Sequence, residues 1–154
     1  MEEVERMPNV FSVANYVLQK AGPMTTMKLQ KLVYYCQAYS LAWDGIPLFE
    51  EDFEAWANGP VCRKLFASHR GTFSLEKDAY SKYEASFSPE QIDTMDAILD
   101  AYVDKSSQWL VTLSHKEQPW IDAREGLPPG VSSQNIIQKE KMQVFYGGFS
   151  VEDK

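Results

Sequence analysis

The chain has 154 residues, of which 44% are hydrophobic, 24% charged and 13% aromatic, and this composition excludes both an intrinsically disordered chain and a membrane protein. A chain of this length typically forms one domain. The net charge is −7, from 22 acidic and 15 basic side chains, and no Lys/Arg cluster forms a basic face, so direct nucleic-acid binding is not expected.

The sequence carries no signal for export or membrane insertion. The N-terminal stretch MEEVERMPNV lacks the basic and apolar regions of a signal peptide. No apolar run approaches the ~20 residues that cross a bilayer. Of the two cysteines, Cys36 lies among apolar helix positions and is interpreted as a small buried side chain. We therefore expect a cytoplasmic protein.

Two helices are predicted at the start of the chain. Apolar residues recur at helical spacing over 10–21, and Gly22-Pro23 ends that helix. Thr25 or Thr26 can cap the second helix, which Gly45 closes. The apolar face of the second helix consists of Leu29, Leu32, Val33, Cys36, Tyr39 and Trp43. The side chains expected off that face are Lys28, Gln30, Lys31 and Gln37.

A less regular region follows the second helix. Pro47 stops helical continuation, and residues 48–58 fit either a strand or an irregular connector. Asn58-Gly59-Pro60 forms a turn, and its proline suits the first position of a helix over 60–66. Residues 70–87 are polar with scattered aromatics, a pattern that predicts a loop or a short hairpin.

The second half of the chain is predicted to be helical. Ser88 and Gln91 form a capping box, which starts a helix that runs to Val103. Ser106 or Ser107 caps the next helix. The side chains expected to point inward from that helix are Trp109, Leu110 and Leu113.

Two further helical segments complete the predicted fold. Pro119 begins a short helical turn, and Ser132 or Ser133 starts a final helix that runs to Tyr146. We find no repeat and no linker. The sequence thus predicts a mainly α protein: a single compact helical domain of about six to seven helices, with a short irregular or β-hairpin insertion around residues 46–87.

Residues 114–120, Ser-His-Lys-Glu-Gln-Pro-Trp, are the most chemistry-like cluster. His115 and Glu117 could act as a base and its orienting carboxylate, or as two metal ligands. Alternatively, His115 bonds locally, while Pro119 sets a helix start and Trp120 fills a pocket. Metal sites need three or four ligands, and the one other histidine lies in a different segment. We favour the structural interpretation and predict no catalytic residue, metal ion or cofactor.

The segment Trp56-Ala57-Asn58-Gly59-Pro60-Val61 has a different character. Gly59 can adopt a backbone conformation that other residues avoid, Pro60 limits the backbone, and Trp56 can anchor the turn. The segment is either a plain helix start or a rigid surface loop that is presented to a partner. Both interpretations can hold together.

Three segments carry a family resemblance: KLQKLVYYCQAYSLAW (28–43), LFEEDFEAWANGPV (48–61) and SHKEQPWIDAR (114–124). In this order and spacing they resemble the successive signature blocks of the Panacea domain, also called the SocA-like antitoxin domain. The first and last predicted helices are similar to the opening and closing helices of that family. We expect the domain to span residues 8–149, with flexible termini at 1–7 and 150–154.

The resemblance implies an antitoxin without enzymatic activity, which neutralises a partner toxin by direct complex formation in a bacterial or phage toxin–antitoxin system. The residues expected to bind the partner or to define the family are Lys28, Gln30, Lys31, Tyr34, Trp56, Asn58, Gly59, Pro60, His115, Glu117, Pro119, Trp120 and Arg124. The cognate toxin is the expected partner, no membrane partner is implied, and a homodimer is left open. The alternatives are a phage- or prophage-borne adaptor or effector that binds a host protein, and a hydrolase that uses His115 and Glu117.

Overall fold

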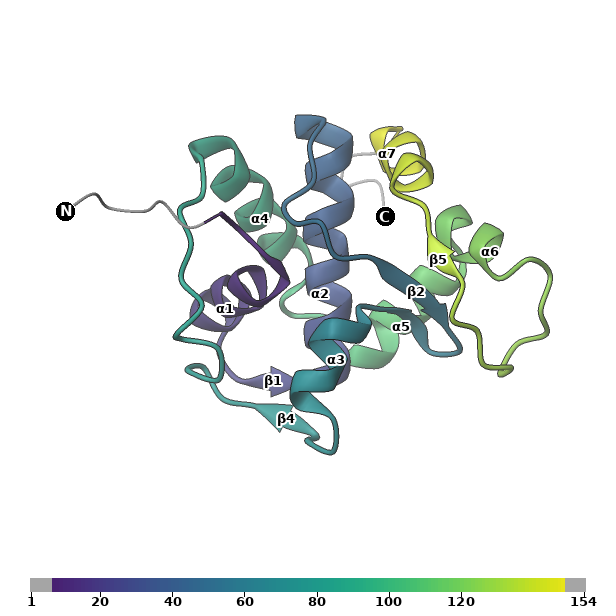
Figure 1. Ribbon diagram of the computed structural model, residues 1–154, viewed down its shortest axis with the longest axis horizontal. Coiled ribbons are helices and arrows are strands. Elements are labelled where there is room, and N and C mark those ends of the chain that lie inside the picture. Colours follow the sequence, from purple (N-terminus) through teal and green to yellow (C-terminus); the bar gives the residue numbers. More distant parts are fainter. Residues whose placement is uncertain (1–6, 149–154) are drawn as a thin grey trace.

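Seven α-helices form within residues 7–148, the part of the chain that the computed structural model describes (Figure 1). They are α1 (Val10–Ala21), α2 (Thr26–Tyr39), α3 (Arg63–His69), α4 (Pro89–Tyr102), α5 (Ser107–His115), α6 (Gln118–Ala123) and α7 (Lys139–Gly147). A π-helical turn, η1 (Ser40–Asp44), extends α2. The predicted mainly α fold in one compact domain is confirmed. Apart from Met7, the termini predicted to be flexible lie outside the described residues.

Helix α2 is the axis of the fold. In Figure 1 it stands upright in the middle, with α1 and α4 on one side and α7 on the other, and α5 also packs against it. Every residue from Leu29 to Leu41 is buried. A helix that is buried on all sides is expected to be apolar all round. Helix α2 departs from this expectation, because its buried residues include Gln30, Lys31 and Gln37.

The prediction that these three polar residues lie off the buried face was wrong, because they form hydrogen bonds with backbone groups of the 48–62 segment, which packs on α2. Gln37 accepts from the Leu48 amide at 2.7 Å and donates to the Phe49 carbonyl at 2.8 Å. Gln30 accepts from the Cys62 amide at 2.9 Å and donates to its carbonyl at 3.3 Å. Buried backbone groups without a strand partner need such bonds.

A small antiparallel sheet lies beside α2, in the strand order β3-β2-β5. Strands β2 (Phe53–Trp56) and β3 (Gly59–Val61) form a hairpin, in which Trp56 pairs with Gly59. Strand β5 (Ile136–Ile137) pairs with the other edge of β2. A second pair joins β1 (Met24–Thr25) to β4 (Ser74–Leu75). The predicted insertion at 46–87 therefore contains a hairpin, and its last strand pairs with β1, which lies between α1 and α2.

Two helix starts were predicted too early. Pro60 belongs to β3, and α3 begins at Arg63; the last helix begins at Lys139, and Ser132 and Ser133 precede it. In both places the chain pairs with β2 before it turns into a helix. Proline lacks an amide hydrogen, and it is tolerated here because β3 is an edge strand.

The predicted helix caps are confirmed where a side chain accepts from the first turn. Thr25 accepts from the Lys28 amide at 3.2 Å, and Ser106 accepts from the Trp109 amide at 3.0 Å. Ser88 caps α4 in a reciprocal capping box with Gln91. Each cap satisfies an amide that has no partner within its own helix.

Two tryptophans that were expected to point inward are at the surface. Trp43 is 40% exposed and Trp109 is 38% exposed. Each lies near an end of its helical segment and packs against a buried tyrosine, with ring centroids 4.8 Å apart for Trp43 and Tyr39 and 5.9 Å apart for Trp109 and Tyr102.

Cys36 and Cys62 are buried free thiols, and burial raises the pKa of both. Neither thiol is therefore poised as a nucleophile.

Within residues 7–148, no helix is both long and apolar enough to cross a membrane.

Candidate functional site

The three signature segments lie against one another in the fold. The Trp120 indole donates to the Trp56 carbonyl at 2.9 Å, and Arg124 donates to the Ala55 carbonyl at 3.0 Å. The same guanidinium also donates to two carbonyls of the 128–131 loop. Helix α6 and the residue that follows it are thereby bonded to β2 and to the loop that leads toward β5.

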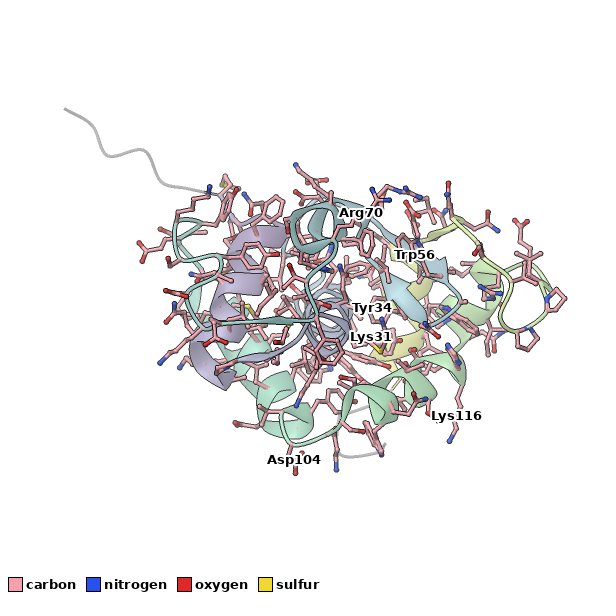
Figure 2. The ribbon with its side chains drawn as sticks, turned by 90° about the horizontal axis from the view of Figure 1, so that it is seen from below. Lys31, Tyr34, Trp56, Arg70, Asp104 and Lys116 are labelled. Atoms are coloured by element: carbon pink, nitrogen blue, oxygen red, sulfur yellow. The ribbon has the colours of Figure 1, made fainter. Side chains whose placement is uncertain are left out.

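Lys31 and Gly59 form a close contact between α2 and the hairpin. The backbone φ of Gly59 is +107°, and a Cβ added there would lie 2.7 Å from Lys31 Cε and 2.8 Å from Ser114 Oγ. Lys31 donates to the Pro60 carbonyl at 3.1 Å. Figure 2 shows Lys31 and Tyr34 inside the molecule, and burial lowers the pKa of Lys31 to about 7.

His115 packs flat on Trp120, with ring centroids 4.2 Å apart, and Arg124 lies 4.9 Å from the centre of the Trp120 ring. Burial lowers the pKa of His115, and the charges of Lys31 and Arg124 lower it further, while a backbone bond to Ala57 opposes them. Within the described chain, Nε2 of His115 has no hydrogen-bond partner. The imidazole thus packs on the indole, in surroundings that favour its neutral form.

Glu117 faces a cluster of buried tyrosines. Its carboxylate accepts from the hydroxyl of Tyr35 at 2.6 Å and from that of Tyr146 at 2.8 Å. The hydroxyls of Tyr146 and Tyr34 are 3.1 Å apart, which extends the network. Glu117 thus contacts tyrosine hydroxyls, whereas His115 packs on the indole ring of Trp120. In the described part of the chain, no group of three or more His, Cys, Asp and Glu side chains could hold a metal ion.

The other predicted site residues are spread over the molecule. Lys28 donates to the Val103 carbonyl at the end of α4, and Pro119 is buried in the first turn of α6. Trp56 is partly exposed, and Asn58 is exposed at the tip of the hairpin. Most of the predicted set is buried, Lys28 and His115 are half-buried, and Asn58 is its one exposed member.

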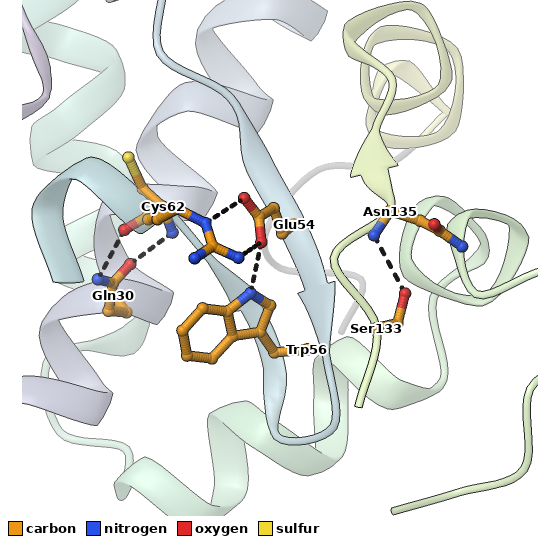
Figure 3. Close-up of polar contacts among 7 residues, drawn as sticks. Gln30, Glu54, Trp56, Cys62, Ser133 and Asn135 are labelled. Carbon is orange, nitrogen blue, oxygen red and sulfur yellow. Dashed lines mark hydrogen bonds and ion pairs between the residues drawn. The ribbon is translucent and has the colours of Figure 1, made fainter. Parts of the chain in front are cut away.

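A groove of about 490 Å³ opens beside that hairpin. Its lining residues come from the hairpin, from α3 and from the chain before β5: Trp56, Ala57, Asn58, Val61, Arg63, Phe66, Ala67, Arg70, Ser132, Ser133 and Gln134. In Figure 3, Trp56 and Ser133 lie on different segments that approach each other.

Sequence reasoning found Trp56 and Asn58 but missed the two arginines of the groove. Arg63 begins α3, Arg70 directly follows its last residue, and both line the groove. Their seven-residue spacing was the available signal, since residues seven apart in a helical segment lie near one face. Ser132–Gln134 could not be found in the same way, because these residues were assigned to a helix.

The sequence matches the family described as "Antitoxin SocA-like, Panacea domain" over residues 29–121. This match runs from α2 through the hairpin and into α6, and the chain belongs to that family.

The chain is also similar to a protein named Antitoxin SocA from Caulobacter vibrioides (strain NA1000 / CB15N). The two are 30% identical over 125 residues, which cover 71% of this chain and 66% of the relative. The chain thus matches slightly less than two thirds of the length of that relative. No solved structure matches the chain.

Proposed function

We propose that this protein is an antitoxin that neutralises a partner toxin by binding it directly in the cytoplasm. Membership of the SocA-like antitoxin family is the observation that carries the proposal. The similarity to the Caulobacter antitoxin supports it further.

The surroundings of His115 and Glu117 support a binding role without chemistry. Glu117 accepts from two tyrosine hydroxyls, and His115 is stacked on an indole ring. Neither residue lines the groove beside the hairpin. We therefore assign both to the scaffold and propose no reaction for them.

Co-expression with the adjacent gene tests this function. We expect the product of that gene to arrest growth when it is produced alone, and co-expression of this protein to restore growth and to yield a complex that purifies as one species. A version of this gene with a stop codon after residue 60 controls for the burden of expression.

A neighbour that is harmless alone, or that still arrests growth beside this protein, contradicts the antitoxin proposal. An adaptor or effector that binds a host protein would then be the function to test.

A further inference from the structure

Three segments that are distant in sequence shape the groove beside the hairpin. One wall is formed by α3 and the residue that directly follows it, with side chains at helical spacing: Arg63, Phe66, Ala67 and Arg70. The opposite face of α3 is anchored in the molecule by Leu65 and His69, which are buried. The lining also includes Ser132 to Gln134, of which Ser133 is buried, and Ala57 and Asn58 of the hairpin turn.

The aromatic part of the groove is held in place before any partner arrives. The Trp56 indole donates to Glu54 at 2.8 Å, and Arg63 holds the same carboxylate through two bonds at 2.9 Å and 3.0 Å. Phe66 packs edge-to-face on Trp56, with centroids 4.9 Å apart. Figure 3 shows this chain of contacts around Glu54. A rigid, partly exposed tryptophan is typical of residues that dominate binding energy.

The charge of the groove is opposite to that of the chain. The chain has a net charge of −7, but the groove lining contains two arginines and no Asp or Glu. Arg63 is neutralised by Glu54, whereas the Arg70 side chain is exposed and forms no ion pair within the described residues. The groove therefore presents one available cation next to an apolar aromatic surface.

We propose that this groove is the docking site for an acidic segment of the partner toxin. An apolar side chain of the segment packs on Trp56 and Phe66, and a neighbouring carboxylate pairs with Arg70. This inference rests on the proposed antitoxin function. A protein segment fits better than a nucleic acid, since a phosphate backbone needs several free cations. The adjacent cations Arg63 and Lys64 are already paired with Glu54 and Glu51.

A charge reversal with a matched control tests the proposed pairing of Arg70 with a carboxylate of the toxin. Arg70→Glu and Lys116→Glu change the net charge equally, and both side chains are exposed; Figure 2 shows them on different sides of the molecule. The probe is the product of the adjacent gene, made by cell-free translation, with affinity measured by calorimetry. We expect Arg70→Glu to weaken binding at least about tenfold, as at other interface hot spots, and Lys116→Glu to change it less than about twofold. Unchanged melting temperatures establish that both variants fold.

A steric variant tests the groove independently of charge. Ala67→Trp places a large ring within the groove, whereas Ala79→Trp places the same ring at an exposed site that does not line it. We expect the first substitution to abolish binding and the second to preserve it.

The outcomes separate the two proposals. If the wild-type chain does not bind the neighbouring gene product, the antitoxin function fails and this inference fails with it. If the wild-type chain binds and both Arg70→Glu and Ala67→Trp bind equally well, the function stands and the docking site is wrong. If Arg70→Glu loses binding to a single-stranded RNA probe while its affinity for the toxin is unchanged, the groove serves a nucleic acid and the proposal is overturned.

Discussion

At Lys31 the fold keeps an amine inside its core with a single acceptor, the Pro60 carbonyl. Burial disfavours the charged form, and this lowers the pKa from 10.5 to about 7. His69 and His115 lie close enough for the charge of Lys31 to contribute to lowering their pKa values as well. A protonated Lys31 therefore disfavours protonation of both histidines.

The titration of Lys31 predicts how stability depends on pH. The unfolded chain keeps the proton up to about pH 10.5, and the folded chain releases it near pH 7. The buried charge therefore lowers the unfolding free energy by its full amount below pH 7. This destabilisation disappears as the pH rises toward 10.5. One pKa unit corresponds to about 1.4 kcal/mol, so the total cost is a few kcal/mol.

In Lys31→Met this titration is absent. We expect the unfolding free energy of the variant minus that of wild type to be largest at pH 6, below the folded pKa of Lys31, and to decline by a few kcal/mol toward pH 10. Urea unfolding between pH 6 and 10 measures this difference, with the exposed Lys116→Met as the control. A difference that is independent of pH would show that Lys31 is not a titrating buried amine.

At the scale of single elements, the β2–β3 hairpin depends on the close approach of its turn to α2. Gly59 has a φ of +107°, and it lies against Lys31 and Ser114 with no room for a Cβ. Gly71 has a similar φ of +84°, but its Cβ would meet nothing within 4 Å. The two glycines therefore separate backbone strain from steric overlap.

We expect Gly59→Ala to lower the unfolding free energy by more than Gly71→Ala does. Backbone strain at positive φ costs about 1–3 kcal/mol in either variant, and the overlap with Lys31 and Ser114 adds to it at Gly59 alone. Thermal unfolding by calorimetry gives the comparison. Equal losses in the two variants would mean that the hairpin moves away from α2 at little cost.

For the whole molecule, the core extends beyond the family match at 29–121. Helix α1 buries Val13, Val17 and Leu18 before it, and α7 buries Met142 and Tyr146 after it. Tyr146 also donates to Glu117, which lies inside the matched region. We therefore infer that the folding unit is close to residues 8–149 and needs both outer helices.

A chain shortened to residues 29–121 is expected not to fold cooperatively, because removal of α1 and α7 exposes the buried sides of α2. A chain of residues 7–148 keeps every described helix and is the control. Circular dichroism during thermal unfolding distinguishes them: the control shows one sharp transition and the shorter chain shows none. A sharp transition in the shorter chain would place the domain boundary at the family match.

Local chemistry explains why some elements were predictable. The bounds of α1 follow from its apolar spacing and the glycine after it, and the Ser88–Gln91 capping box marks the start of α4. The helix predicted to start at Pro60 was wrong, because the helix-start preference of proline is local. The pairing of Pro60 with Ala55 depends on tertiary structure. The helix start predicted at Ser133 was wrong for a similar reason, since the chain after it pairs with β2 before α7 begins.

The sequence by itself determined the helical class, most helix boundaries and the family of this protein, because caps, periodicity and ordered signature segments act over short distances. Tertiary structure alone decided which polar residues are inside. Gln30, Lys31 and Gln37 are buried because backbone groups of the 48–62 segment need their hydrogen bonds. It also decided where the groove lies, since α3, the hairpin and the 132–134 segment are brought together only when the core packs around α2.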